Sequence, residues 1–369
     1  MAAAGGFDGS NVRATLRARK HALGSITRYA YRPFDVRWVY WDPDEKLLDR
    51  ARPEFFGNTG FENRFLTAGE RNRMGVFYRP QSISVLGDHH LVESNVAIFP
   101  ATVRQDSQNL EPNVAKSLKE ELANRGISSS QLFDHILATL NAPAYEVGYI
   151  DALRIDWPRI PFPGELEVFT SSAKLGARLS GLLDAEIDVE GVTRGSLLAG
   201  LSAVATPRGK SFEVTAGWGY SQRRDNGTRL VMPGGGKTDM RGWTDAERNA
   251  LSELASRHDL DLETLLGLIG EQAVDVHIND EAKWVGVPAK VWDYTLGGYQ
   301  VLKKWLSYRE ADVLGRALTG DEALHFAKTA RRITEILCMG PALDAAHAKA
   351  RDCAVPWVGG KPGEIVGEK

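Results

Sequence analysis

Cysteine and long apolar segments are both scarce in this sequence of 369 residues. Only Cys338 and Cys353 occur, too few for a network of disulfide bonds or for a metal site built from four thiolates. No run approaches the roughly 18 consecutive apolar residues that a membrane-spanning helix needs, and the N-terminal residues lack the apolar core of a secretory signal. We therefore expect a cytoplasmic protein with reduced thiols and no membrane partner.

Net charge is also low, at −3, which argues against nucleic acid as a ligand until its distribution along the chain is considered. Residues 1–104 carry +4, 105–200 carry −6, 201–243 carry +4, 244–293 carry −7 and 294–369 carry +2. Basic segments beside acidic ones can form a local positive face that the total conceals. Solvated charge distributed by chance is an equally weighted alternative.

Strand and helix patterns alternate along the chain and predict a mixed α+β fold. Period-two runs predict strands at Ile26–Arg32 and Asp35–Trp41, and Asn226-Gly227 indicates a hairpin turn. Capping signals predict helices that begin after Ser130, after Thr244 (with Glu247) and after Thr319 (with Glu322). The predicted parts are a β-rich N-terminal part at 1–105, a helical part at 106–190, a basic glycine-rich β/loop excursion at 191–243, an α/β C-terminal part at 244–358 that includes a long helix, and a disordered tail at 359–369.

The catalytic motifs that the sequence suggests fail on spacing. Pro233–Thr238 is rich in glycine, but Val231 stands where a phosphate-binding loop needs its first glycine. We interpret this segment as a flexible basic turn whose backbone could approach a DNA phosphate. Asp275, Glu281 and Lys283 have a faint nuclease pattern that is common by chance. No methyltransferase or ATPase motif is present, so we assign no catalytic residue and no metal ligand.

Clusters of arginine and lysine interleaved with aromatic residues remain. Arginine is favoured where guanine edges or phosphates are bound by two hydrogen bonds at once. A structural alternative holds for two of the clusters: the aromatic residues at 29–40 could simply alternate across a sheet, and Lys328, Arg331 and Arg332 could form the solvated face of a helix.

Three strings carry a resemblance to a known family. They are YRPFDVRWVY at Tyr31–Tyr40, PRIP at Pro158–Pro161 and VPAKVWDYTLGGYQVLKKWL at Val287–Leu306. From about Ile26 to about Arg351 the sequence resembles the C-terminal specificity (target-recognition) domain of type ISP restriction–modification enzymes and adenine-specific DNA methyltransferases. The resemblance implies double-stranded DNA as the ligand. It also implies an adenine-N6 methyltransferase core, in cis or in trans, that uses S-adenosylmethionine; no cofactor is expected in this chain itself.

The resulting hypothesis is a sequence-specific module that recognises double-stranded DNA for a restriction–modification system and lacks a catalytic core of its own. Two alternatives stay open, a small Mg²⁺-dependent nuclease around Glu281 and a subunit that docks on a methyltransferase without touching DNA. The predicted DNA-binding residues are Arg223, Arg224, Arg229, Lys237 and Arg241 in the excursion, with Arg79, Lys303 and Lys304 as secondary candidates.

Overall fold

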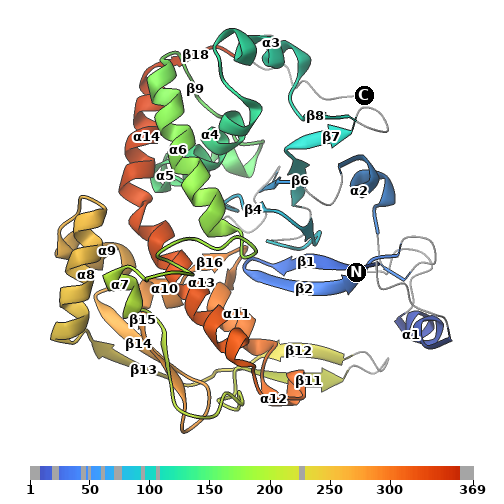
Figure 1. Ribbon diagram of the computed structural model, residues 1–369, viewed down its shortest axis with the longest axis vertical. Helices are drawn as coiled ribbons and strands as arrows, with labels where there is room; N and C mark the ends of the chain where they lie inside the picture. The colour runs from blue at the N-terminus through green and yellow to red at the C-terminus, as the bar shows by residue number, and fades with distance from the viewer. Residues whose placement is uncertain are drawn as a thin grey trace.

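A computed structural model describes residues 9–18, 25–42, 47–48, 51–59, 63–69, 77–92, 96–104, 109–223 and 229–357. The predicted tail at 359–369 lies outside these residues, as do Arg224 and the Asn226-Gly227 turn. The molecule has two parts, drawn one above the other in Figure 1. The helices α13 (Gly320–Cys338) and α14 (Gly340–Asp352), separated only by Met339, run through both parts and connect them.

The N-terminal segment forms small sheets of short strands. The antiparallel strands β1 (Ile26–Arg32) and β2 (Asp35–Tyr40) make a hairpin, as predicted, and β1 also pairs in parallel with β5 (Leu86–Gly87). The other elements of this segment are α1 (Gly9–Ala18), α2 (Pro53–Thr59), β3 (Phe65–Ala68), β4 (Ser82–Ile83), β6 (Ala97–Pro100), β7 (Thr102–Arg104) and β8 (Leu110–Pro112).

Helices make up most of the upper part of the molecule. They are α3 (Lys116–Asn124), α4 (Ser129–Asn141), α5 (Pro143–Tyr149), the 3₁₀ helix η2 (Ala152–Arg154) and α6 (Leu166–Leu183). The predicted cap of α4 is wrong: Ser128, not Ser130, is the N-cap and forms a capping box with Gln131. Gly176 lets α4 and α6 approach closely, because a Cβ there would lie 1.8 Å from the carbonyl oxygen of Asp134.

The lower part is built on an antiparallel four-stranded sheet with the order β10-β15-β14-β13. Its strands are β10 (Thr206–Arg208), β13 (Thr238–Gly242), β14 (Gln272–His277) and β15 (Lys283–Pro288). Trp284 of β15 stacks on Phe326 of α13 with ring centroids 4.0 Å apart, which places the core between this sheet and α13. The predicted excursion and C-terminal part therefore share one sheet.

The remaining elements lie around this sheet, except for the β9–β18 pair, which lies in the upper part (Figure 1). They are α7 (Ala199–Ser202), α8 (Asp245–Arg257), α9 (Leu262–Ile269), α10 (Ala289–Trp292), α11 (Val301–Ser307), α12 (Ala311–Leu314), and the pairs β11 (Gly219–Arg223) with β12 (Arg229–Pro233), β16 (Thr295–Leu296) with β17 (Tyr299–Gln300), and β9 (Phe162–Pro163) with β18 (Ala354–Val355). Both capping boxes predicted at Thr244 and Thr319 are present. The mixed α+β class is confirmed.

Two arginines of α13 are buried instead of facing solvent. Arg331 donates to the carbonyl of Leu201, and Arg332 donates to the carbonyls of Gly181 and Leu182 at the end of α6. A cation at the C-terminal end of a helix interacts favourably with the helix dipole and with its unsatisfied carbonyl groups. The interpretation of these arginines as a solvated face is wrong. Among the described residues no helix is long and apolar enough to cross a membrane.

Candidate nucleic-acid interface

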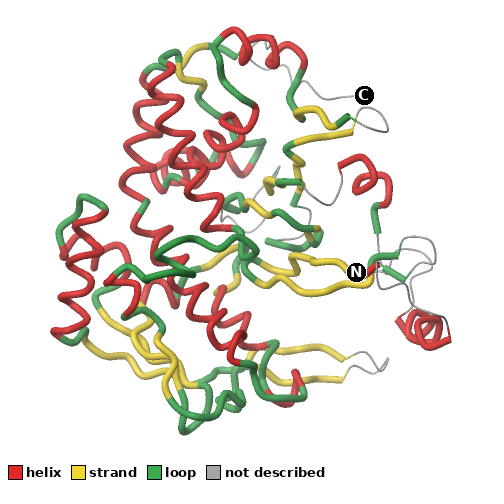
Figure 2. The backbone as a smooth tube through the Cα atoms, viewed as in Figure 1, coloured by secondary structure: helices red, strands yellow, loops and turns green. Residues whose placement is uncertain are grey.

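The strand pairs β1–β2, β7–β8 and β11–β12 all extend toward the same side of the molecule, on the right in Figures 1 and 2. The strands β11 and β12 are antiparallel, and Arg223 lies opposite Arg229 at the last described pair before the predicted Asn226-Gly227 turn, which is itself outside the described residues. Arg223 is exposed at the end of β11. Residues 211–218 form a loop that leads into β11.

Glu310 fixes the base of this hairpin. Its carboxylate accepts hydrogen bonds from the backbone N–H groups of Gly217 (3.0 Å) and Trp218 (2.8 Å), immediately before β11. Gly219 allows the hairpin to contact α11, because a Cβ there would lie 2.2 Å from the carbonyl oxygen of Ser307. The hairpin is thus anchored at one end, and the strands carry Arg223 away from that anchor.

The glycine-rich turn after β12 packs over an indole ring. A Cβ on Gly236, whose φ is +68°, would lie 1.9 Å from the ring of Trp218. The N–H of Gly234 donates to the carbonyl of Trp218 (2.7 Å) and that of Gly236 to the carbonyl of Gly217 (3.0 Å). These two N–H groups are therefore bonded within the fold. The glycines allow the backbone to approach Trp218 closely, whether or not the turn also contacts a phosphate.

Two predicted DNA-binding arginines are held by carboxylates of the chain itself. Arg241 on β13 donates two hydrogen bonds to Glu247 (2.7 and 2.8 Å) and one to Asp275 (3.2 Å). Arg79 pairs with Glu146 at 3.0 Å. Lys237 is exposed just before β13, with its Nζ 3.6 Å from Asp280. The assignment of these three residues to DNA stays a prediction.

Lys303 and Lys304 lie on α11, which packs against both strands of the β11–β12 hairpin. The Nζ of Lys304 lies 5.0 Å from the ring centroid of Tyr299 and 4.9 Å from that of Tyr308. Burial, together with the nearby charge of Arg32, lowers the pKa of Lys304 below its ordinary value. Of the predicted residues, Lys303 and Lys304 lie on the helix that packs against this hairpin, whereas Arg223 lies at the far end of β11 from Gly219, the residue that approaches α11.

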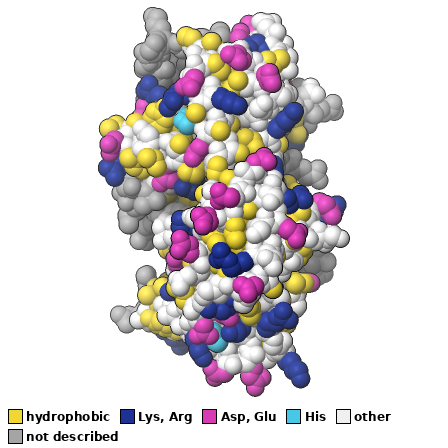
Figure 3. All heavy atoms as spheres, turned by 90° about the vertical axis from the view of Figure 1, so that its left-hand side faces the viewer, with side chains coloured by type: hydrophobic (Ala, Val, Ile, Leu, Met, Phe, Trp, Pro, Cys, Tyr) yellow, Lys and Arg dark blue, Asp and Glu magenta, His cyan; other side chains and the backbone are white. Residues whose placement is uncertain are grey.

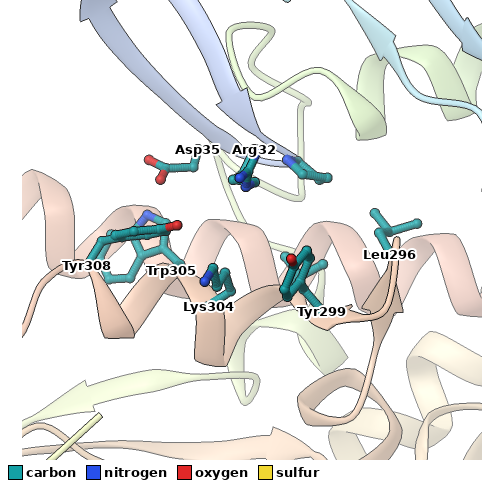
Figure 4. A pocket seen from close by; sticks show the side chains of 9 residues that line it. Arg32, Asp35, Leu296, Tyr299, Lys304, Trp305 and Tyr308 are labelled. Atoms are coloured by element: carbon teal, nitrogen blue, oxygen red, sulfur yellow. The ribbon is translucent and has the colours of Figure 1, made fainter. Parts of the chain in front are cut away.

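The β1–β2 hairpin joins this group through α11 and the residues that follow it. The rings of Tyr31 and Tyr308 meet edge to face at 5.5 Å, and the guanidinium of Arg37 lies over both, at 4.2 and 4.8 Å. Arg309 lies 3.9 Å above the ring of Trp305 and donates to Asp35. Figure 4 shows a small cleft between these elements, with Arg32 and Asp35 on one side and Lys304, Trp305, Tyr308 and Tyr299 on the other.

Trp38 presents the most exposed aromatic ring among the described residues, with 66% of its surface accessible. The Arg28 guanidinium lies 4.8 Å from the centroid of this ring, and Arg28 is directly opposite Trp38 in the register of β1 and β2. Glu186 fixes Arg28 through two hydrogen bonds of 2.7 and 2.6 Å. A cation that is held in this way immobilises the ring and leaves its outer surface free for a ligand.

None of the arginine and aromatic residues at 28–41 is among the DNA-binding residues predicted from the sequence. The signal was there, since arginine and aromatic residues alternate in Arg28–Arg32 and again in Arg37-Trp38. What the pattern did not show is that Tyr308 and Arg309, more than 250 residues later in the sequence, complete the same surface. A contact between a hairpin and a distant segment leaves no periodic pattern in the sequence from which it could be predicted.

The residues of the nuclease alternative do not form a metal site in the described part of the chain. Asp275 is buried, and its carboxylate accepts from Lys283 (2.8 Å), Arg241 (3.2 Å) and the N–H of Gly286 (3.1 Å). Glu281 is exposed in the turn between β14 and β15. Over the residues that the structure describes, no group of three or more His, Cys, Asp and Glu side chains could hold a metal ion.

The face of the molecule away from the three hairpins carries charges of both signs. In Figure 3, basic and acidic side chains are interspersed over this face, together with scattered apolar patches. The helices α8 and α14 lie on this side in Figure 1. The exposed residues Arg257 on α8 and Lys349 on α14 therefore provide controls for charge changes away from the three hairpins.

Two solved structures share the fold of the chain and are complexes with DNA. One is a DrdV–DNA complex, with a TM-score of 0.55 and 18% identity over 92% of this chain and 30% of that one. The other is the ATP-dependent type ISP restriction–modification enzyme LlaBIII bound to DNA, with a TM-score of 0.53 and 12% identity over 91% of this chain and 19% of that one. The chain thus spans less than a third of the length of either protein. Among curated protein sequences none matches it.

The family model of the type ISP C-terminal specificity domain matches residues 11–336, most of the chain. The chain therefore belongs to this family of specificity domains. The resemblance inferred from the three sequence strings is confirmed.

Proposed function

We propose that the chain recognises a sequence in double-stranded DNA for a restriction–modification system. The observation that carries this proposal is the position of α11, which packs against β11–β12, while Tyr308 and Arg309 directly after it contact β1–β2. Arg37 and Lys304 both lie over the ring of Tyr308, and the β1–β2 and β11–β12 hairpins, which carry the exposed residues Trp38 and Arg223, extend toward one side of the molecule (Figure 1). Phosphate contacts from such residues supply affinity, while arginine side chains in a groove read base edges.

The family and the two DNA complexes with the same fold support this function. Within it, the chain serves an adenine-N6 methyltransferase core, in cis or in trans, that uses S-adenosylmethionine in the cytoplasm. This part of the proposal rests on the family alone, and no residue of the chain is assigned to the methyl donor.

Binding measurements across salt concentrations test the proposal. Each phosphate contact contributes a slope of about −0.9 to log K against log salt on duplex DNA. Replacing Arg223 and Arg224 with Ala is expected to weaken binding and to flatten this slope, whereas Arg257→Ala on the opposite face should leave both unchanged. An affinity and a slope that stay at the wild-type values in the double variant would remove the β11–β12 hairpin from the interface.

The two alternatives give different results in the same preparations. A subunit that only docks on a methyltransferase would show no duplex binding even at low salt. A nuclease would cleave supercoiled plasmid with Mg²⁺, and Glu281→Ala would abolish that cleavage. We expect duplex binding without cleavage.

A further inference from the structure

Three hydrogen-bond donors that line the cleft between β1–β2 and α11 lack partners. The Nε of Arg32 and the Nε1 of Trp305 are buried and form no hydrogen bond with any described residue. Only 5% of Trp305 is exposed, so solvent does not readily supply a partner for its N–H. Within the described part of the chain, the Nζ of Lys304 contacts only the rings of Tyr299 and Tyr308. A buried donor without a partner is unfavourable, so two such donors beside the half-buried ammonium of Lys304 point to an acceptor that comes from outside the chain.

The charges around the cleft favour an anion. Arg32, Arg37, Lys304 and Arg309 approach it, and Asp35 is the carboxylate in its lining. Both oxygens of Asp35 are already occupied, Oδ1 by Arg309 (2.7 Å) and Oδ2 by Arg37 (2.6 Å). Among the described residues, Arg32 and Lys304 have no carboxylate within ion-pair distance. The Nη1 of Arg32 donates to the carbonyls of Tyr31 and His90, which carry no charge to neutralise it. The charge of Arg32 and Lys304 is therefore left for a ligand.

The size of the cleft limits what can enter. Its open volume is about 20 Å³, which admits one or two atoms of the size of a water oxygen. A nucleobase ring is too large for this cleft. One oxygen atom of a phosphate group can enter it while the rest of the phosphate stays outside. The rings of Tyr299 and Tyr308 line the opening and hold the ammonium of Lys304 between them.

We infer that this cleft binds a phosphate of the DNA backbone, with Arg32, Lys304 and the indole N–H of Trp305 donating to its oxygen atoms. The inference rests on the proposed function and adds a defined anchoring point to it. Phosphate contacts fix the register of a protein on its duplex without reading sequence. The cleft would thus position the β1–β2 and β11–β12 hairpins, while other residues read the bases.

The test uses the full chain, a duplex obtained by selection from a random pool, and an unrelated duplex. Lys304→Gln is expected to reduce the magnitude of the salt slope by about 0.9, the value for one phosphate, and to weaken binding by the same factor on both duplexes. Lys304→Arg keeps the charge and should keep the slope. Trp305→Phe removes one N–H and should weaken binding roughly two- to tenfold. Lys349→Gln is the matched control, and thermal unfolding verifies that every variant folds.

Each outcome distinguishes the cleft from the function as a whole. If the wild-type chain binds duplex and Lys304→Gln keeps its slope, the cleft is not a phosphate site, although the proposed function stands. A loss restricted to the selected duplex would assign Lys304 to a base edge and overturn the inference. Titration with inorganic phosphate alone tests whether the cleft binds free phosphate instead of DNA. Saturable binding to the wild-type chain that is lost in Lys304→Gln, together with an unchanged salt slope for DNA in that variant, would assign the cleft to free phosphate. No duplex binding by the wild-type chain would overturn both proposals.

Discussion

Arg309 donates from Nη2 to Oδ1 of Asp35 over 2.7 Å, across 274 residues of sequence. Asp35 is 2% exposed and also accepts from Arg37. Burial by itself would raise the pKa of Asp35, but Arg309 and Arg37 hold it below its ordinary value. The ionised carboxylate therefore joins the β1–β2 hairpin to the residues after α11 and fixes the two sides of the cleft relative to one another.

Replacing Asp35 with Ala is expected to destabilise the protein by roughly 3–5 kcal/mol, because removing one partner of a buried ion pair leaves uncompensated charge. Urea unfolding measures the change. Asp151→Ala is the control, since Asp151 also pairs with an arginine but its side chain is 89% exposed, and surface pairs contribute at most about 1 kcal/mol. Equal effects of the two substitutions would contradict the structural role of Asp35.

Two neighbouring glycines in the turn after β12 should respond differently to alanine. Gly236→Ala introduces a Cβ 1.9 Å from the Trp218 ring at a φ of +68°, whereas a Cβ on Gly235 meets nothing within 4 Å. We expect Gly236→Ala to cost on the order of 2–4 kcal/mol from overpacking and backbone strain, and Gly235→Ala to cost well under 1 kcal/mol. Thermal unfolding compares the two. If both were tolerated, the glycines would not be explained by the approach to Trp218.

Glu310→Gln should loosen the β11–β12 hairpin without unfolding the core. A glutamine has one oxygen to accept from the two N–H groups of Gly217 and Trp218, so one hydrogen bond is lost at a cost of about 1–3 kcal/mol. Hydrogen exchange is expected to become faster at Gly217, Trp218 and along β11 and β12. The exposed Glu213, changed to Gln, provides the control. Unchanged protection of the hairpin in Glu310→Gln would show that other contacts anchor it.

Lowering the pH should reduce the free energy of unfolding through protonation of Glu247. Hydrogen bonds from Arg241 and Thr244 lower the pKa of Glu247 from 4.5 to about 2. Because the pKa of this carboxylate is lower in the folded state, its stabilising contribution is complete above pH 4.5 and is lost as the pH falls toward 2. Glu247→Gln should make the free energy of unfolding less dependent on pH in this window, compared with Glu253→Gln at an exposed site on the same helix. The measurement is urea unfolding at several pH values; parallel curves for the two variants would contradict the assignment.

Local patterns predicted local structure well and long-range packing poorly. The strands at 26–32 and 35–40 and the helices after Thr244 and Thr319 follow from side-chain alternation and capping residues. The sequence did not predict α14, because Gly340 and Pro341 next to Cys338 read as an end of α13 and not as the first turn of another helix. Nor did it separate Arg241, which pairs with Glu247 and Asp275, from Arg223, which is exposed, since partners on other strands leave no mark in the composition.

The anchoring of β11–β12 at its base separates two kinds of position in one hairpin. Gly219 and the two residues before it are constrained by contacts with Ser307 and Glu310. The outer residues of β11 are exposed and do not pack in the core: Tyr220, Gln222 and Arg223. Mutation can therefore change the outer positions at little cost in folding, while the anchor keeps the hairpin in place. If the chain recognises DNA as proposed, this division would let new target preferences arise by point mutation without a new scaffold.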